Sequence, residues 1–368
     1  MADTQVALVL QGGGALGAYQ GGVFQGLTEH NINIDWVVGT SIGAINGAII
    51  AGNPPGRRLQ KLEEFWRLVG REPYSLFSYP AYSAWLKPWT DANRVMDVLV
   101  NGVPGFFKPR SSIPWDINRK ALANHTSFYD TSPLKETLEQ LVDFDYLNAG
   151  HVRCTVCAVN VATSELTIFD NIEQAINPLH IMASGALPPG FPPVEIDGEI
   201  YWDGGIYSNT PIDIVLDDAE RRDTLCFMID LWDPTENVPT TIGEAISRQK
   251  DIQYASRSHE HLDDHRKLQN LRRAIGILSE HIPAKDRKLP EIKRLLDLSC
   301  NSAINIVRLI MKALPEDDHT KDIDFTRSTV NARWKAGHHD IERALHHKNW
   351  LEPLPPHLGM AVHELKQK

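Results

Sequence analysis

The stretch VVGTSIGAING, residues 37–47, passes from a β-branched apolar run through a glycine turn into a helix-forming run. Its centre, Gly39-Thr40-Ser41-Ile42-Gly43, has the pattern G-x-S-x-G in the strand–turn–helix context that this pattern requires. A serine on so sharp a turn has a strained backbone, and Gly39 and Gly43 let the strand and the helix approach each other. The stretch therefore predicts that Ser41 is a nucleophile at the N-terminus of a helix, where the helix dipole favours negative charge. A purely structural turn is the alternative.

A second glycine turn lies upstream, in LVLQGGGALGAYQGG, residues 8–22. The glycines of residues 12–17 satisfy G-x-G-x-x-G, a pattern that cradles a dinucleotide pyrophosphate at a helix N-terminus. A dinucleotide-binding unit also needs an acidic residue at the end of its second strand, but Asp35 stands at the start of that strand and Ser41 follows its end. We therefore interpret the loop as an oxyanion hole and keep dinucleotide binding as an alternative. The predicted backbone donors are Gly12, Gly13 and Gly14.

A serine nucleophile needs a base, and two kinds of residue are available. Asp203 ends a strand in EIYWDGGIYSNTPI and precedes two glycines, so its carboxylate can reach a serine directly. Partial desolvation at that position would raise its pKa and its basicity. His259, His261 and His265 lie in HEHLDDH, a strongly polar run that is typical of a solvated helix face. Asp203 is the predicted base, and a triad completed by one of these histidines is the alternative.

The composition excludes several classes of protein. The chain has 368 residues, of which 42% are apolar and 23% charged, as in a soluble globular protein. A formal net charge of −10 argues against a nucleic-acid partner. The four cysteines lie in apparent strands or a helix, which predicts buried thiols and a cytoplasmic location. No motif indicates a metal or a cofactor, and no stretch approaches the ~20 apolar residues of a membrane span.

Apolar and helix-forming runs alternate as far as Trp232, which predicts an α/β fold, a three-layer sandwich with a mostly parallel central sheet. The glycines between residues 15 and 30 predict a helix that packs very closely on its neighbours, because they weaken it otherwise. The predicted strands cover residues 5–10, 34–38, 152–163 and 224–232, with antiparallel strands at 164–170 and on both sides of Asp197-Gly198. The predicted helices cover residues 15–30, 42–52, 56–70, 131–143 and 211–220.

The sequence changes character after Trp232, where DPTENVPTT is typical of a linker. We expect a catalytic domain at residues 1–235 and a mostly helical extension at residues 236–368. Residues 243–314 carry 14 Lys and Arg against 9 Asp and Glu, so this basic segment is expected to pack on or beside the acidic body. The extension is predicted to contain helices at residues 242–281, 289–314 and 328–350, and a short strand at residues 322–327.

An insertion at about residues 71–130 is rich in aromatic residues, with nine of them between Tyr74 and Trp115. One interpretation is a satellite hydrophobic cluster under an irregular segment. The other is a lid or wall of an apolar substrate groove that contacts lipid. Together with the basic helices, this segment leaves peripheral membrane contact open, and nothing in the sequence indicates an oligomeric state.

These blocks together resemble the pattern of patatin-like phospholipases. Gly12–Gly17 is similar to the family's oxyanion-hole block, and Gly39–Gly43 to its nucleophile block. Asp203–Gly205 is similar to its dyad block, and Ala183–Pro193 to the proline-bearing block that precedes it. The resemblance covers roughly residues 5–220, and the extension resembles that of a bacterial subgroup.

The resemblance implies a serine acyl hydrolase with a Ser-Asp dyad, similar to a phospholipase A or a lysophospholipase, that acts on lipid esters without metal or cofactor. Ser41 takes the place of the nucleophile and Asp203 that of the base. One departure is Leu16, because many members carry Lys or Arg at this point of the glycine block. An esterase that acts on esters other than phospholipids is the alternative.

Overall fold

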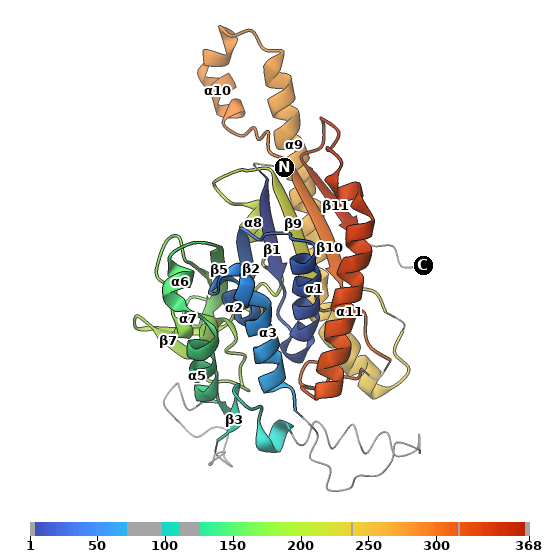
Figure 1. Ribbon diagram of the computed structural model, residues 1–368. Helices are drawn as coiled ribbons and strands as arrows, with labels where there is room; N and C mark the ends of the chain where they lie inside the picture. The colour runs from blue at the N-terminus through green and yellow to red at the C-terminus, as the bar shows by residue number, and fades with distance from the viewer. Residues whose placement is uncertain (1–3, 72–97, 111–125, 237, 316, 365–368) are drawn as a thin grey trace.

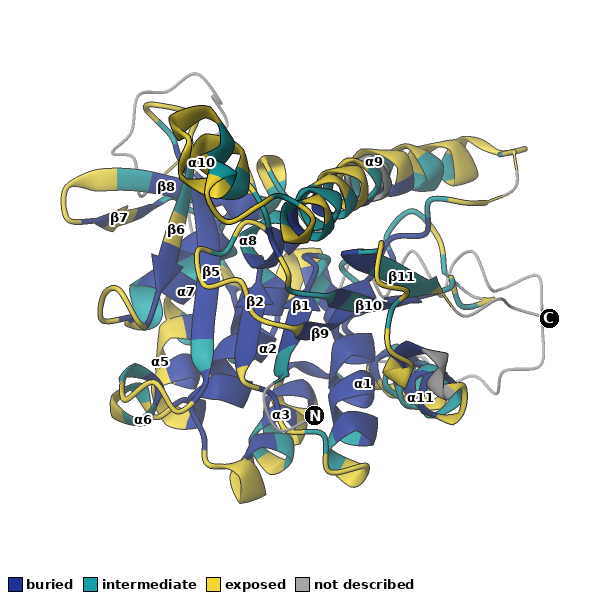
Figure 2. Cartoon of the chain, turned by 90° about the horizontal axis from the view of Figure 1, so that it is seen from above, coloured by how far each residue is buried: buried dark blue, intermediate teal, exposed yellow. Residues whose placement is uncertain are grey.

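The computed structural model describes residues 4–71, 98–110, 126–236, 238–315 and 317–364. A nine-stranded sheet lies at its centre, and helices cover both faces of the sheet (Figure 2). The prediction of an α/β fold with three layers and a mostly parallel central sheet is therefore confirmed.

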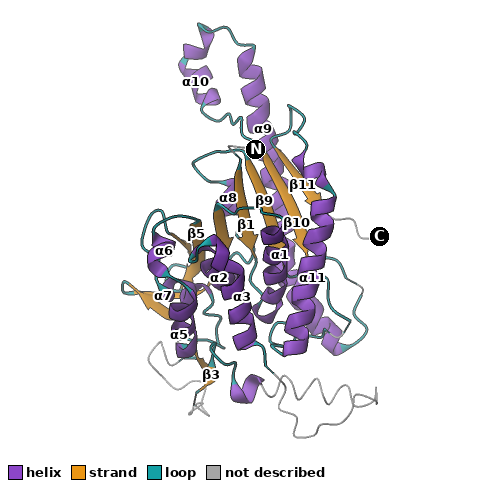
Figure 3. Cartoon of the chain, in the orientation of Figure 1, coloured by secondary structure: helices purple, strands orange, loops and turns teal. Residues whose placement is uncertain are grey.

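The elements alternate along the chain, as the sequence predicts for its first part (Figures 1 and 3). The strands of the central sheet are β1 (Gln5–Leu10), β2 (Trp36–Gly39), β5 (Arg153–Asn160), β6 (Leu166–Asp170), β7 (Val194–Ile196), β8 (Glu199–Asp203), β9 (Thr224–Asp230), β10 (Ile304–Ile310) and β11 (Met360–Glu364). The longer helices are α1 (Ala18–Glu29), α2 (Ile42–Ala51), α3 (Pro55–Val69), α5 (Ser132–Leu141), α9 (Ile242–Glu280) and α11 (Arg327–His346). The shorter helices are α6 (Phe144–Asn148), α7 (Pro178–Ser184), α8 (Ile212–Leu216) and α10 (Pro290–Leu296), and a separate ribbon joins β3 (Lys108–Pro109) to β4 (Tyr129–Asp130).

The sheet has the order β11-β10-β9-β1-β2-β5-β8-β7. The strands from β11 to β5 pair in parallel, whereas β6, β7 and β8 pair antiparallel, as predicted for this part of the chain. Side chains of β1 alternate between the two faces: Leu8 and Leu10 join the core under α1, α2 and α11, and Ala7 and Val9 join the core under α8 and α9. Both faces are apolar because both are covered.

The pairing of β5 brings two distant parts of the chain together. The last residue of β2, Gly39, lies opposite Val156 of β5. Strand β6 pairs with the opposite edge of β5. Strand β8 therefore pairs with the same edge of β5 as β2 does, farther along β5, and Asp203 lies opposite Ala158. The end of β8 therefore lies beside the turn that follows β2.

The prediction of one helix over residues 289–314 is wrong. Helix α10 ends at Leu296, and β10 then joins the sheet in parallel beside β9. The run INIVRLI contains one charged residue, Arg308. In the structure Arg308 is buried against Asp230, with its Nε 2.7 Å from Oδ2, so the charge belongs to a strand inside the sheet.

Other parts of the extension give mixed outcomes. Helices α9 and α11 confirm the predictions at residues 242–281 and 328–350. The predicted strand at residues 322–327 is wrong, because these residues form a connection with one isolated bridge, between Arg71 and Thr326. The domain boundary near residue 235 stays a prediction, although β10 and β11 continue the sheet of the preceding part. The second half of α9 and α10 project beyond the sheet at the top of Figure 1.

The glycines of α1 have the predicted role of allowing close packing. A Cβ on Gly22 would collide with the carbonyl oxygen of Trp334 in α11, and a Cβ on Gly337 would collide with the carbonyl oxygen of Tyr19. The backbones of α1 and α11 are thus in direct contact, so a helix from the extension is packed against the helix that follows the first glycine loop.

Burial of the cysteines confirms a further prediction. The four cysteines are buried and free, and burial raises the pKa of the Cys154 and Cys157 thiols to about 12. Phe106 and Phe107 are buried against Phe191 and belong to the main core rather than to a separate satellite cluster. The other seven aromatic residues between Tyr74 and Trp115 lie outside the described residues. Every helix among the described residues is too short or too polar to cross a lipid bilayer.

Candidate active site

Ser41 lies at a strained turn between β2 and α2. Its backbone has φ 55° and ψ −121°, a combination that side-chain-bearing residues rarely adopt. A Cβ on Gly39 would collide with the carbonyl oxygen of Gly43, and a Cβ on Gly43 would collide with that of Leu10. Both glycines are therefore needed for the turn to form, which is the role that the sequence predicts for them.

Asp203 lies beside this serine. The hydroxyl of Ser41 is close enough to the carboxyl of Asp203 to lower its pKa, and Oδ1 of Asp203 accepts the N–H of Gly205 at 2.7 Å. The residue is 3% exposed, and this burial raises the pKa of its carboxyl to about 7, although the hydrogen bond from Gly205 and the nearby Ser41 hydroxyl lower it. A carboxylate with this pKa is matched to accepting a proton near neutral pH.

Two histidines of the alternative triad contact Asp213 rather than Ser41. His261 Nδ1 lies 2.9 Å from Oδ2 of Asp213 on α8, and His265 Nε2 lies 3.1 Å from Oδ1 of the same residue. The side chain of His259 lies outside the described part of the chain. Among the described side chains, Asp203 is thus the group that the structure brings to Ser41.

The first glycine loop lies against the serine. A Cβ on Gly12 would be 3.2 Å from Cβ of Ser41. The N–H of Gly12 donates to the carbonyl of Asn209 at 3.1 Å, so this amide is already engaged. The amides of Gly13 and Gly14 donate to no other residue that the structure describes. The loop thus offers two amides rather than the three that the sequence suggests.

A segment of the extension supports this loop. Gly14 has φ +56°, and a Cβ there would collide with the carbonyl oxygen of Asp322. The same carbonyl accepts the N–H of Ala15 at 2.8 Å. Lys250 of α9 holds the side chain of Asp322, with its Nζ 2.7 Å from Oδ1. Leu16, the departure from the family pattern, is fully buried and directs no charge toward the site.

Asn209 is a site residue that the sequence analysis does not identify. Its Nδ2 donates to the carbonyl oxygen of Gly12 at 3.1 Å, and its own carbonyl accepts the N–H of Gly12. Trp232 Nε1 adds a second bond to the same oxygen at 2.9 Å. Asn209 therefore ties the glycine loop to the loop that follows Asp203. The polar run Ser-Asn-Thr-Pro after Asp-Gly-Gly was the available signal.

The proline-bearing block also contacts the nucleophile. The N–H of Ser41 donates to Oγ of Ser184 at 3.0 Å, and Gly185 lies beside the serine, since a Cβ there would be 3.9 Å from Oγ of Ser41. Asp203 N–H donates to the carbonyl of Ala186 at 3.0 Å. The block that joins nucleophile and base in the sequence thus joins them in space.

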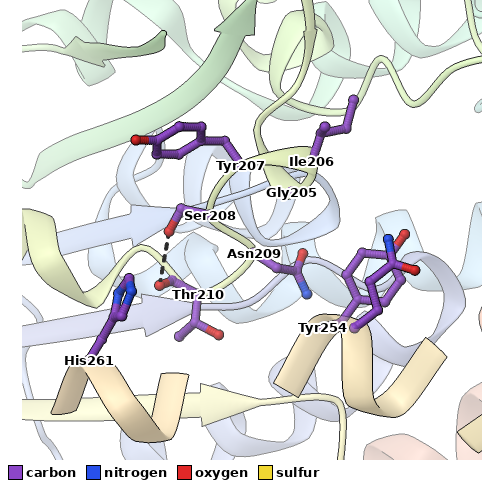
Figure 4. A pocket seen from close by; sticks show the side chains of 9 residues that line it. Gly205, Ile206, Tyr207, Ser208, Asn209, Thr210, Tyr254 and His261 are labelled. Carbon is purple, nitrogen blue, oxygen red and sulfur yellow. Dashed lines mark hydrogen bonds between the residues drawn. The ribbon is translucent and has the colours of Figure 1, made fainter. Parts of the chain in front are cut away.

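Two different surfaces flank the dyad. A small polar pocket is lined by residues 205–210 and by Gln253, Tyr254 and His261 of α9 (Figure 4). Ile206 and Tyr207 extend from the loop away from His261 in Figure 4, and they are 42% and 53% exposed. Leu187, next to the contact of Ala186 with Asp203, is 39% exposed. The loop after Asp203 and the proline-bearing block thus each expose apolar side chains.

Comparison with known proteins identifies the family of this chain. A family model described as patatin-like phospholipase matches residues 8–216, more than half of the chain. A second model, described as patatin phospholipase, matches residues 252–357 in the extension. The chain belongs to the patatin-like phospholipase family.

Particular relatives match parts of the chain. The uncharacterized NTE family protein Rv2565 of Mycobacterium tuberculosis is 27% identical over 223 residues, 60% of this chain and 30% of that protein. Lysophospholipase nte1 of Aspergillus terreus is 59% identical over 82 residues, 20% of this chain and 5% of that protein. This chain thus spans at most 30% of the length of these relatives. The crystal structure of VipD from Legionella pneumophila shares 14% identity over 94% of this chain and 67% of that chain, with a TM-score of 0.39, too low to carry an argument.

Proposed function

We propose that this protein is a serine acyl hydrolase that cleaves lipid esters with a dyad of Ser41 and Asp203. The observation that carries the proposal is the proximity of a strained, half-buried serine to a buried carboxyl whose pKa is raised to about 7. Membership of the patatin-like phospholipase family and the lysophospholipase among the relatives support lipid esters as the substrate class.

In the first step, Asp203 accepts the proton of Ser41 while Oγ attacks the ester carbonyl carbon. The carbonyl oxygen becomes an oxyanion, which the amides of Gly13 and Gly14 stabilise, and Gly12 provides the space for its approach. The carbon–oxygen bond to the alcohol then breaks. The alcohol leaves with the proton held by Asp203, and the acyl group stays on Ser41.

In the second step, water gives a proton to Asp203 and its oxygen attacks the acyl carbon. The tetrahedral intermediate collapses, the bond to Ser41 breaks, and Oγ recovers the proton from Asp203. The products are a carboxylic acid and the free enzyme. The same base thus serves both halves of the reaction, and a histidine is not required.

The surroundings of the dyad support an amphipathic substrate. The exposed side chains of Leu187, Ile206 and Tyr207 provide apolar contacts for an acyl chain, with peripheral contact to a lipid surface as part of the proposal. The pocket beside Tyr254 and His261 is polar and suits the alcohol portion of the ester. The proposed specificity is for a lipid ester of the phospholipid or lysophospholipid type, with other carboxylic esters as the alternative.

A fluorophosphonate probe tests the nucleophile. The wild-type protein should be labelled, and Ser41→Ala should not; equal labelling of both would refute the assignment. Hydrolysis of p-nitrophenyl esters, phospholipids and lysophospholipids by the unlabelled wild-type enzyme then ranks the substrate classes.

A matched pair of variants tests the base. Asp203→Asn should lose hydrolysis by roughly 10³-fold or more, as removal of a catalytic base does in other serine hydrolases. The variant His265→Ala should keep its activity, because this histidine contacts Asp213 and not Ser41 and lies outside the polar pocket. If only the histidine variant is inactive, the protein is a triad hydrolase.

The dinucleotide alternative has a specific observation against it. The carboxylate of Asp35, the nearest acidic candidate for a ribose, accepts the N–H of Val6 at 2.8 Å. A thermal-shift titration with NAD or NADP should therefore leave the unfolding temperature unchanged.

A further inference from the structure

Four side chains with metal-binding groups meet where α1 ends beside α11. Glu29 is the last residue of α1, and His30 follows it. His338 and Glu342 lie one turn apart on α11 and so point from the same face. His338 Nε2 lies 2.7 Å from Oε2 of Glu29, and His30 Nε2 lies 2.9 Å from Oε1 of Glu342. Glu29, His338 and Glu342 thus form one group across two helices, and His30 contacts this group through Glu342.

The spacing of these groups fits a single ion. The ligand atoms of Glu29, His338 and Glu342 all lie within 4.8 Å of one another. Zinc binds imidazole nitrogen and carboxylate oxygen at about 2.0–2.2 Å, which places the ligand atoms of a tetrahedral site roughly 3.3 Å apart. Each of these three side chains is at least a quarter exposed, so small rotations can bring their atoms to this spacing. His30 is 41% exposed, and rotation of its side chain can bring Nε2 to the fourth position.

One of the carboxylates is already oriented by its neighbours. Gln25 Nε2 donates to Oε1 of Glu29 at 2.7 Å, and Trp334 Nε1 donates to Oε1 of Gln25 at 2.7 Å. This chain of bonds fixes one oxygen of Glu29 and directs the other toward His338. Hydrogen bonds of this kind, made by residues outside the ligand set, orient the ligands in metal sites.

The spacing of the two helices is also fixed. A Cβ on Gly26 would collide with the side chain of Ile341, and a Cβ on Gly337 with the carbonyl oxygen of Tyr19. Because α1 and α11 cannot separate or slide without losing this contact, the four side chains are held near one another before any ion binds. A preformed site needs less ordering when it binds its ligand.

We propose that Glu29, His30, His338 and Glu342 bind one zinc ion and that this ion links α1 to α11. Two imidazoles favour zinc over calcium or magnesium, which prefer oxygen ligands alone. Because α1 follows the glycine loop and α11 belongs to the extension, the ion stabilises the contact between the two parts of the chain. This inference goes beyond the proposed function and does not depend on it.

Isothermal titration of the untagged full-length protein with zinc chloride tests the site. We expect saturable binding of one ion per chain. At a hundredfold excess over the dissociation constant, zinc should raise the unfolding temperature by about 3 °C, since a ligand that binds only the folded state stabilises it. Calcium and magnesium should not compete with zinc.

Variants distinguish this site from adventitious binding. His338→Ala and Glu342→Gln should each weaken zinc binding by roughly tenfold or more. His339→Ala, on an exposed neighbouring position of α11, and His261→Ala, in the other histidine cluster, should bind zinc as the wild type does. Absence of saturable binding, unchanged binding by both ligand variants, or loss of binding in His261→Ala would overturn the proposal.

Discussion

Ser41 and Asp203 are each held in a state that costs stability. The serine has a positive φ that glycine adopts more easily, and the carboxyl is buried so that its ionised form is disfavoured. Such strain persists only where the surrounding structure enforces it. The close backbone contacts at Gly39 and Gly43 hold Ser41 in its positive φ. The residues that cover the end of β8 keep the carboxyl of Asp203 buried.

The strain at Ser41 predicts an order of stability among its variants. Ser41→Gly should be more stable than Ser41→Ala by about 1 kcal/mol, because alanine keeps the unfavourable φ and glycine relieves it. Both variants lack the hydroxyl and should be inactive, so activity does not confound the comparison. Urea denaturation of the two proteins measures the difference; equal stability would show that the positive φ is not strained.

The raised pKa of Asp203 predicts a pH-dependent stability difference. Between about pH 4 and pH 7 the folded protein keeps a proton that the unfolded chain releases, so this group makes stability fall as pH rises through that window. The asparagine in Asp203→Asn carries no charge and still offers an acceptor to Gly205. Calorimetry should therefore show a higher unfolding temperature for the variant than for the wild type at pH 8. At pH 4.5 the two unfolding temperatures should differ little. The same gain at both pH values would contradict a raised pKa.

Sequence alone leads to Ser41 and Asp203 because each stands at a glycine-marked strand end. It does not lead to Asn209, because a polar residue in a loop has no pattern that distinguishes a structural contact from a solvated one. Glycine spacing shows where the backbone is unobstructed, but it does not show which amides already have a partner. The N–H of Gly12 donates to the carbonyl of Asn209, which lies 197 positions away in the sequence.

At the scale of elements, the contact of α1 with α11 is formed by backbone on backbone. Replacement of Gly337 by alanine should cost about 3 kcal/mol of unfolding free energy, because the new Cβ would collide with the carbonyl of Tyr19 and nothing flexible lies there to move. Gly56→Ala in α3 is the matched control, since a Cβ there meets nothing within 4 Å. The free energy of unfolding of Gly56→Ala should equal that of the wild type or exceed it by less than about 1 kcal/mol. Chemical denaturation that showed equal effects for the two variants would contradict this packing.

The elements that the sequence predicts correctly have a clear hydrophobic periodicity and clear residues at their two ends. Strand β1 and helices α2, α3 and α11 have both. Strand β10 lies where the sequence analysis predicts a helix. It contains the buried Arg308, and only the tertiary partner Asp230 explains a charge inside a sheet. The short strand β11 was not predicted, since it forms by pairing along β10.

At the scale of the whole molecule, the extension completes the structure around the site. It supplies β10 and β11 to the sheet, α11 to the face of α1, and the carbonyl of Asp322 to the glycine loop at residues 12–17. Its ion pair of Lys321 with Asp251 is buried, which binds α9 to the segment beside that loop.

A chain cut at residue 235 should therefore not fold into an active enzyme. The cut exposes the edge of β9 and the apolar face under α11, and both favour aggregation. Expression of residues 1–235 beside the full chain, followed by size-exclusion chromatography and esterase assay, tests this expectation. A monodisperse and active fragment would show that the first part is an independent domain.

The central claim is that Asp203 is the base for Ser41, and the pH dependence of fluorophosphonate labelling tests it most directly. The labelling rate constant of the wild type should rise with pH through a midpoint near the Asp203 pKa of about 7, because only the ionised carboxylate accepts the serine proton. Asp203→Asn should be labelled far more slowly and should lose this midpoint. A variant labelled at the wild-type rate with the same midpoint would contradict the account.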